Sequence, residues 1–250
     1  MLQTGLIKRH KHMMNAQPDT DIETRRKKAT PLEYTLLRLR AAIEEGRLPP
    51  GVRLPEEKLA RALNASRARV REVLALLANE RLVDLQANRG AFVARPTIAD
   101  ALHICEARLM AEKAMARLAA DRASPRDLKI MRDLLDRERA AWDTNDVRTA
   151  VNLSRNFHRA IADAAGNPVL ADILTSLLSR SALTQAVYAA RGAAGCLCHD
   201  HVALLDAIAA GDADRAETVM AEHVQNMIDR LDLEPLLQDV DIEDALRNTF

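Results

Sequence analysis

The sequence is poor in aromatic, glycine and proline residues, which is typical of a helical protein. Only six of its 250 residues are Phe, Trp or Tyr, and it contains eight glycines and nine prolines. Ala, Leu, Arg, Asp and Glu dominate instead, a mix that favours helices. With 48% hydrophobic and 29% charged residues, the composition is that of a soluble globular protein of one or two domains.

Cysteines and long apolar runs are scarce as well. The three cysteines, Cys105, Cys196 and Cys198, cannot form a disulfide framework, which indicates a reducing cytoplasm. The CxC pair is too short and isolated to predict a metal site, so we expect two ordinary thiols in a loop. No apolar run is long enough for a membrane span, and residues 1–30 lack a signal-peptide segment. We therefore expect a cytoplasmic protein without a membrane partner.

The net charge of zero hides an uneven distribution. Residues 1–97 contain 19 Lys and Arg against 11 Asp and Glu, whereas residues 98–250 contain 17 against 25. A basic front half and an acidic back half indicate two modules with different partners. Positive charge of this kind usually meets phosphate. Chance drift produces similar imbalances, so the interpretation depends on the motifs.

The front half predicts a compact unit of short helices after a polar arm. Residues 1–29 are basic and lack an apolar period, so we expect a mobile arm. Helices are predicted over 31–45, 56–63 and 67–79, separated by a Gly/Pro-rich break and by the tight connection "NAS". Ser66 ends that connection and is a good N-cap for the third helix.

Three arginines stand at alternate positions in "SRARVREVL", at the start of this third helix. Helical periodicity still gives the helix one aliphatic core face, formed by Val70, Val73, Leu74 and Leu77. Arg67 and Arg71 lie on one flank of that face, and Arg69 lies on the other. Two helices joined by a three-residue turn predict a helix-turn-helix whose second helix enters a DNA major groove N-terminus first. That end of a helix attracts phosphate, and arginine suits the edge of guanine.

The segment "LVDLQANRGAFVA" (82–94) predicts two short strands around a turn at Gly90. This hairpin would form a wing with Arg89 at its tip, facing a minor groove. Three arginines alone are more typical of a solvated, charged helix face. Because the turn, the cap, the wing and the charge asymmetry agree, we favour a DNA-binding domain over residues 30–96.

At this point the chain resembles the winged helix-turn-helix of the GntR family of bacterial transcription regulators, from about residue 31 to residue 96. The segments "IEEGRLPPGVRLPEEKLARALNASRARVREVLALLANERLV" and "NRGAFV" follow the family patterns, including "S-R-x-x-V-R-E-x-L" and the wing "G-A-x-V". The resemblance implies phosphate and base contacts at Ser66, Arg67, Arg71, Arg89 and Gly90.

The chain departs from the family pattern at two positions. Members often have Thr-Pro, Ser-Pro or Gly-Pro where Ala68–Arg69 stand, so Arg69 is expected to add a phosphate contact of its own. Some members place a DNA-reading arginine where this chain has Glu57, which leaves that contact open.

From Thr97 onward the apolar spacing is helical throughout, which predicts an antiparallel bundle of about six helices over residues 97–250. The expected helices span residues 98–121, 125–142, 146–165, 168–190, 198–210 and 213–233. The fold class is therefore mainly α, with three helices and a hairpin wing followed by an all-α bundle.

The back half also resembles the FCD domain of FadR-type GntR regulators. The resemblance is carried by "EARLMAE" (106–112), "FHRAIADAAGNPVL" (157–170), "HDHVALLDAIAAGDADRA" (199–216) and "MAEHVQNM" (220–227). Many family members bind a divalent metal, often zinc or nickel, through an Asp and three His. The matching histidines are His158, His201 and His223.

The family Asp is replaced by Ser154, four residues before His158. A neutral hydroxyl is a poor zinc ligand. Three imidazoles still suffice to hold a metal, with water or an effector carboxylate in the open positions; alternatively, the histidines bind an anion directly. We favour the metal.

Arg108 matches an arginine that faces the effector pocket of FCD domains, where its planar fork suits a carboxylate. The competing interpretation is a structural ion pair with Glu112, four residues along the same helix.

The sequence as a whole predicts a homodimeric transcription regulator, a repressor by family default. It would bind a palindromic DNA operator under the control of a small organic acid. A zinc-dependent hydrolase with a three-His site is the main alternative, and an architectural DNA binder is a third. No carboxylate in a motif offers a general base, so we do not expect an enzyme.

Overall fold

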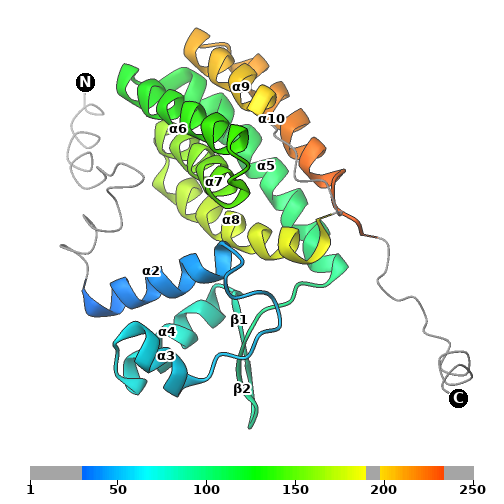
Figure 1. The fold of residues 1–250 in the computed structure, drawn as a ribbon. Coiled ribbons are helices and arrows are strands. Elements are labelled where there is room, and N and C mark those ends of the chain that lie inside the picture. Colours follow the sequence, from blue (N-terminus) through cyan, green and yellow to red (C-terminus); the bar gives the residue numbers. More distant parts are fainter. Residues whose placement is uncertain (1–29, 190–197, 234–250) are drawn as a thin grey trace, which may run out of the picture.

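The computed structural model describes residues 30–189 and 198–233, which form two stacked modules (Figure 1). The winged module contains the elements from α2 to β2, and the helical bundle contains those from α5 to α10. The predicted basic arm and Cys196 lie outside the described residues. Within those residues, no helix has the length and apolar character needed to cross a membrane.

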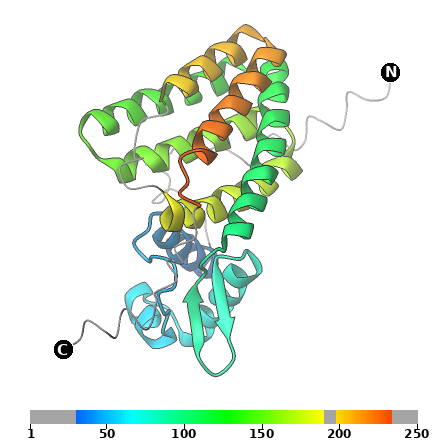
Figure 2. The same ribbon diagram turned by 90° about the vertical axis from the view of Figure 1, so that its right-hand side faces the viewer.

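The winged module contains three helices and one hairpin among the described residues. They are α2 (Pro31–Glu44), α3 (Glu56–Leu63), α4 (Arg67–Asn79), β1 (Val83–Gln86) and β2 (Gly90–Val93). The two strands pair antiparallel, and the hairpin projects away from the bundle (Figure 2). The order of elements confirms the predicted winged helix-turn-helix.

Local chemistry explains where these helices begin and end. The Thr30 hydroxyl accepts from the Glu33 backbone N–H, the Glu33 carboxylate accepts from the Thr30 N–H, and Pro31 opens α2. Asn64 ends α3 in the left-handed region, at φ 50°. The Ser66 hydroxyl then accepts from the Arg69 backbone N–H at 3.2 Å, as expected of an N-cap.

The core of the winged module follows the predicted face of α4. Val70, Val73, Leu74 and Leu77 are all buried, and they pack with Leu39, Ile43, Leu82 and Val93. Leu183 also belongs to this cluster, although it comes from the bundle helix α8. The two modules therefore share part of one apolar core.

The bundle contains six helices in the described residues, as predicted. They are α5 (Ile98–Arg122), α6 (Pro125–Asp143), α7 (Val147–Ala164), α8 (Pro168–Tyr188), α9 (Cys198–Ala210) and α10 (Ala213–Ile228). Thr97 and Ser124 form capping boxes with Asp100 and Asp127, which explains the starts of α5 and α6.

The last helix ends five residues before the predicted position 233. The chain leaves the helix because Leu231 forms an antiparallel bridge with Ala189, directly after α8. The Asp232 N–H then donates to the Tyr188 carbonyl at 2.7 Å. This tertiary pairing satisfies the backbone outside the helix and has no signature in the helical periodicity.

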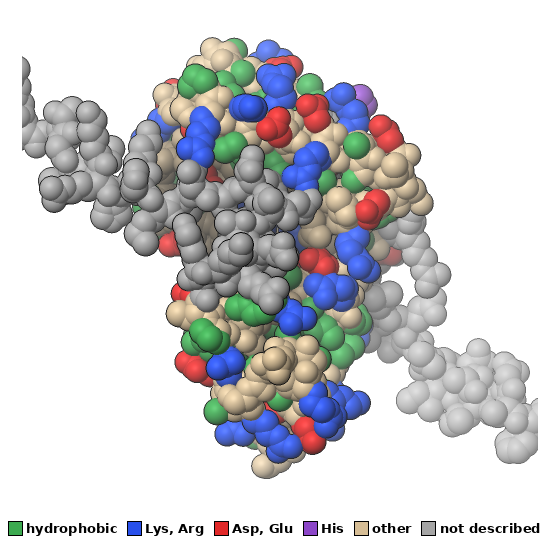
Figure 3. Space-filling view, turned by 60° about the vertical axis from the view of Figure 1, so that its left-hand side comes forward, with side chains coloured by type: hydrophobic (Ala, Val, Ile, Leu, Met, Phe, Trp, Pro, Cys, Tyr) green, Lys and Arg blue, Asp and Glu red, His purple; other side chains and the backbone are tan. Residues whose placement is uncertain are grey.

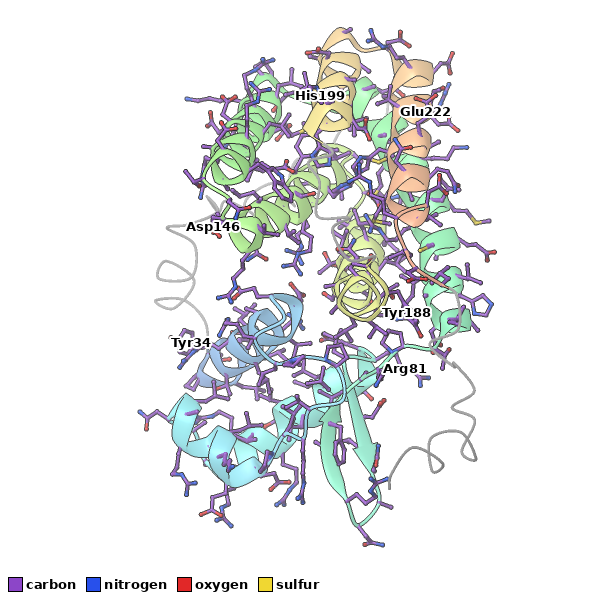
Figure 4. All side chains as sticks on the ribbon, turned by 45° about the vertical axis from the view of Figure 1, so that its right-hand side comes forward. Tyr34, Arg81, Asp146, Tyr188, His199 and Glu222 are labelled. Carbon is purple, nitrogen blue, oxygen red and sulfur yellow. The ribbon has the colours of Figure 1, made fainter. Side chains whose placement is uncertain are left out.

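Helix α8 lies along the base of the bundle and contacts the winged module (Figures 1 and 4). Leu183 enters the winged core, and the Tyr188 hydroxyl donates to the Pro96 carbonyl at 2.9 Å. Ser179 donates to the carboxylate of Glu44, the last residue of α2. These contacts fix the winged module against the bundle.

Candidate functional sites

The recognition helix α4 presents its first turn at the end of the molecule away from the bundle. Arg67, Ala68 and Arg71 are exposed, while Arg69 is half-buried. Lys and Arg side chains gather at this end of the molecule, with a few acidic side chains among them (Figure 3). The helix thus presents its Arg67 and Arg71 flank to solvent, and its Arg69 flank is partly covered.

Two of the predicted DNA contacts are engaged in ion pairs with α3. Arg71 makes a bidentate pair with Glu56, at 3.1 and 2.8 Å, and Arg67 lies 3.3 Å from Glu57. The hydrogen bond from Arg71 lowers the pKa of the Glu56 carboxyl. DNA phosphates must therefore compete with these acids for the same guanidinium groups.

The wing carries its arginine as predicted. Gly90 has φ +96°, a conformation that side-chain-bearing residues rarely adopt, and it closes the turn after Arg89. The Arg89 guanidinium lies 5.7 Å from the centroid of the Phe92 ring. Arg89 makes no ion pair with a carboxylate of the described residues, so its charge is free for a phosphate or a minor groove.

The three predicted histidines converge in the centre of the bundle. His158 comes from α7, His201 from α9 and His223 from α10, and all three are buried. The Nε2 of His223 lies 3.3 Å from that of His201 and 3.2 Å from that of His158. His199, two residues before His201, is exposed instead (Figure 4).

A carboxylate from a neighbouring helix faces the Nδ1 of each histidine. The pairs are His158 with Glu112, His201 with Glu138 at 2.9 Å, and His223 with Asp200 at 3.4 Å. Such a partner holds the proton on Nδ1 and leaves the Nε2 lone pair free to coordinate a metal.

The electrostatics of the three-histidine site fit a cation. Burial lowers the pKa of His158 and lowers that of His223 to about 3, so these rings are neutral at pH 7. Nε2 lone pairs that converge to 3.2–3.3 Å repel one another unless a cation lies between them. Nitrogens bound to tetrahedral zinc at about 2.0–2.1 Å are themselves roughly 3.3 Å apart. The donor set therefore suits zinc or a similar ion.

Ser154 lies on α7 one turn before His158 and is half-buried. Its hydroxyl brings no negative charge to the site. The described acids nearest the rings face Nδ1, on the side away from the convergent Nε2 atoms. The three rings thus offer three nitrogen ligands and leave open positions at the site.

Arg108 is buried and held on three sides. Its Nε donates to Glu112 at 2.7 Å, and its Nη1 donates to Ser181 on α8 at 2.8 Å and contacts the Met227 sulfur at 2.8 Å. Burial opposes ionisation of Glu112, but its interactions with Arg108 and His158 together outweigh the cost of burial and lower the pKa of that carboxyl. The ion pair weighed in the sequence therefore exists. Through Glu112 it also connects Arg108 to His158.

Sequence reasoning missed two sets of polar residues. Glu138 and Asp200 stand behind the histidines. Glu138 lies in no quoted motif, and Asp200, which lies within the segment 199–216, was not identified as a partner of a histidine. Arg155 and Arg159, which flank His158 on α7, lie against Glu44 of the winged module, at 3.5 and 3.4 Å from its carboxylate. Their charge and spacing were visible, but their partner lies more than a hundred positions away.

Comparison with known proteins decides the family. The profile of "Bacterial regulatory proteins, gntR family" matches residues 35–93, and that of the FCD domain matches residues 103–226. An Escherichia coli (strain K12) protein named as a regulator of the L-lactate dehydrogenase operon is 32% identical over 214 residues, covering 75% of this chain and 81% of its own. The chain belongs to the GntR family.

Other GntR-family relatives agree in sequence and in structure. LutR of Bacillus subtilis (strain 168) is 26% identical, covering 76% of this chain and 95% of its own, and the repressor NanR of Escherichia coli (strain K12) is 27% identical, covering 71% and 75%. The solved structure of Escherichia coli McbR/YncC shares the fold with a TM-score of 0.74 at 24% identity, covering 80% of this chain and 96% of that one. A regulator from Rhodococcus sp. RHA1 superposes with a TM-score of 0.69 at 26% identity, with the same coverage.

These relatives are transcription regulators, and so is this member of the GntR family. The family is not one of enzymes, and the hydrolase alternative gains no support. GntR regulators bind DNA, and FCD domains bind small-molecule effectors, with metal in some cases.

Proposed function

We propose that this GntR-family regulator binds a palindromic operator as a homodimer in the cytoplasm and releases or tightens it in response to a small carboxylate. Residues 30–96 would bind DNA through Ser66, Arg67, Arg69, Arg71, Arg89 and Gly90. Residues 97–250 would bind the effector and form the dimer. The relative NanR is named a transcriptional repressor, which supports the proposal that this protein represses transcription.

The single observation that carries the effector site is the convergence of three buried imidazoles, each backed by a carboxylate. We assign His158, His201 and His223 as ligands of a divalent metal, zinc or nickel. A bound metal would supply positive charge and open positions for a carboxylate. With Ser154 in place of an acid, the protein adds no negative ligand of its own, so an anionic effector meets less competition there.

Arg108 is the proposed second contact of the effector. Its guanidinium lies behind the histidines, tied to Glu112 and to Ser181 on α8. An arriving carboxylate would compete with Glu112 for the same charge. A relative's name connects it with an operon for L-lactate dehydrogenase, which supports a small hydroxy acid as the class of effector.

Two routes lead from this site to the winged module. Arg108 donates a hydrogen bond to Ser181 on α8. Ser179, Leu183 and Tyr188 of the same helix contact the winged module. His158 lies on α7 between the two arginines that contact Glu44. A ligand that changes the position of α7 or α8 would therefore change the placement of the recognition helix.

Native mass spectrometry of the protein, purified without chelators, tests the assignment. We expect a dimer with extra mass equal to one metal ion per chain. His158→Ala should lose that mass, whereas His199→Ala, which removes an exposed imidazole from α9, should keep it. Equal metal content in the two variants would contradict the three-histidine site, and a monomer would contradict the dimer.

A further inference from the structure

A hollow of about 300 Å³ lies between the start of α2 and the turn that joins α3 to α4. It is lined by Pro31, Tyr34, Thr35, Arg38, Leu63, Asn64 and Arg69. The lining contains two guanidinium groups and no carboxylate. Such a hollow is complementary to an anion.

The two arginines of this hollow differ from the other arginines near the recognition helix. Arg61, Arg67 and Arg71 each pair with an acid of α3. Neither Arg38 nor Arg69 makes an ion pair with a carboxylate in the described part of the chain. Two uncompensated positive charges in one hollow repel each other, and an anion between them would relieve that repulsion.

Neighbouring groups restrict the Arg38 guanidinium and the Arg69 backbone before any ligand arrives. The Arg38 guanidinium lies over the Tyr34 ring, 5.8 Å from its centroid, which restricts its rotamers. Arg69 is half-buried, and its backbone is held by the Ser66 cap. A planar guanidinium that is already oriented loses little entropy when it binds phosphate oxygens.

The position of the hollow indicates which phosphate it would bind. A major groove is bounded by two sugar–phosphate backbones, and a helix that enters it has one on each flank. Arg67 and Arg71 lie on the α3 side of α4, whereas Arg69 faces α2 across the hollow. The two flanks of α4 would therefore meet opposite strands.

We propose that Arg38 and Arg69, with Tyr34 and Asn64, form a cradle for a backbone phosphate of the DNA strand opposite to the one contacted by Arg67 and Arg71. The inference rests on the proposed operator binding and adds a site on α2. It makes α2 a DNA-contacting helix rather than only a support for the recognition helix.

The test is the salt dependence of binding to a duplex that the protein has itself selected from a random pool. Each phosphate contact contributes about 0.9 to the slope of log affinity against log salt. The proposed dimer has two such cradles, so the double variant of Arg38→Gln and Arg69→Gln should lower that slope by about 1.8, and each single variant should lower it by part of that amount. Arg38→Lys should keep it, since an ammonium also neutralises a phosphate. Arg81→Gln is the control, because Arg81 lies at the other side of the winged module from Tyr34 (Figure 4).

A second measurement locates the phosphate. Duplexes with one neutral methylphosphonate at successive positions should reveal a linkage whose neutralisation weakens the wild type but not Arg38→Gln. Slopes of Arg38→Gln and Arg69→Gln equal to the wild type, with binding still lost in Arg67→Ala, would overturn the cradle and leave operator binding intact. Binding of inorganic phosphate that needs Arg38, detected by ³¹P NMR, without any change in these slopes, would also overturn it. Failure of the wild type to select any duplex would overturn the proposed function itself.

Discussion

At the scale of single residues, two cations of the recognition helix, Arg67 and Arg71, are paired with acids of the same protein. Glu56 forms an ion pair with Arg71, and Glu57 forms one with Arg67. Both arginines lie near the N-terminus of α4, where the helix dipole disfavours fixed cations. The acids therefore stabilise the arginines in place. They also lower the positive charge that an unrelated duplex would meet.

We expect Glu56→Gln to raise affinity for an unrelated duplex by roughly threefold, since Arg71 is then released from competition with a carboxylate. Fluorescence anisotropy with a random-sequence duplex measures this. Glu72→Gln, which removes an exposed neighbouring acid that has no ion pair in the described residues, should have less effect. Weaker binding by Glu56→Gln would instead mean that Glu56 orients Arg71 for the DNA.

At the scale of helices, α7 and α8 join the histidine site to the winged module. Glu44 accepts from Ser179 and lies against Arg155 and Arg159, and Arg155 also donates to the Glu44 carbonyl at 3.0 Å. Burial lowers the pKa of Arg155, although the facing carboxylate of Glu44 favours its charged form. The contact is thus a buried polar link between modules, in which each partner depends on the others.

We expect Glu44→Gln to destabilise the fold by about 3 kcal/mol, because it leaves a buried guanidinium without its counter-charge. The same change should reduce the ratio between the DNA affinity measured with zinc and that measured with a chelator, because it removes the ion pairs that connect α7 to α2. Thermal unfolding and anisotropy measure the two effects. Glu45→Gln, at the neighbouring residue whose partner is Arg47, should preserve the ratio. An unchanged ratio in Glu44→Gln would exclude this link as a route of control.

Helix boundaries and faces were predictable because short-range chemistry determines them. The core face of α4, the Ser66 cap and the Gly90 turn all follow from residue types within a few positions of each other. The pairing of Arg71 with Glu56 depends on how α3 packs on α4, and the end of α10 depends on its bridge to the end of α8. Such contacts arise between elements, and periodicity carries no information about them.

At the scale of the whole molecule, the histidine set was predictable only through the family resemblance. Three histidines on separate helices have no local pattern that joins them, and the carboxylates behind them were found only in the structure. The charge asymmetry had predicted two modules with different partners. It gave no indication that Leu183 of the acidic half completes the core of the basic half.

A regulator should discriminate strongly between its operator and other DNA. We expect the selected duplex to be a palindrome, and to bind at least about a thousandfold more tightly than an unrelated duplex at the same salt concentration. Competition anisotropy measures the ratio. Nearly equal affinities would favour an architectural DNA binder over an operator-specific regulator.

The shared core also bears on how such proteins can be recombined. Leu183 is only 2% exposed, and every other buried residue of its apolar cluster belongs to the winged module. A chimera cut at the junction before α5, with a foreign DNA-binding domain, would leave this leucine facing water and leave a hole in the donated partner. A chimera whose DNA-binding domain keeps the apolar residues that surround Leu183, and an acid at the position of Glu44, would avoid both defects. Whether a helical bundle and a winged module are compatible therefore depends on the volumes of the side chains between them as well as on the length of the linker.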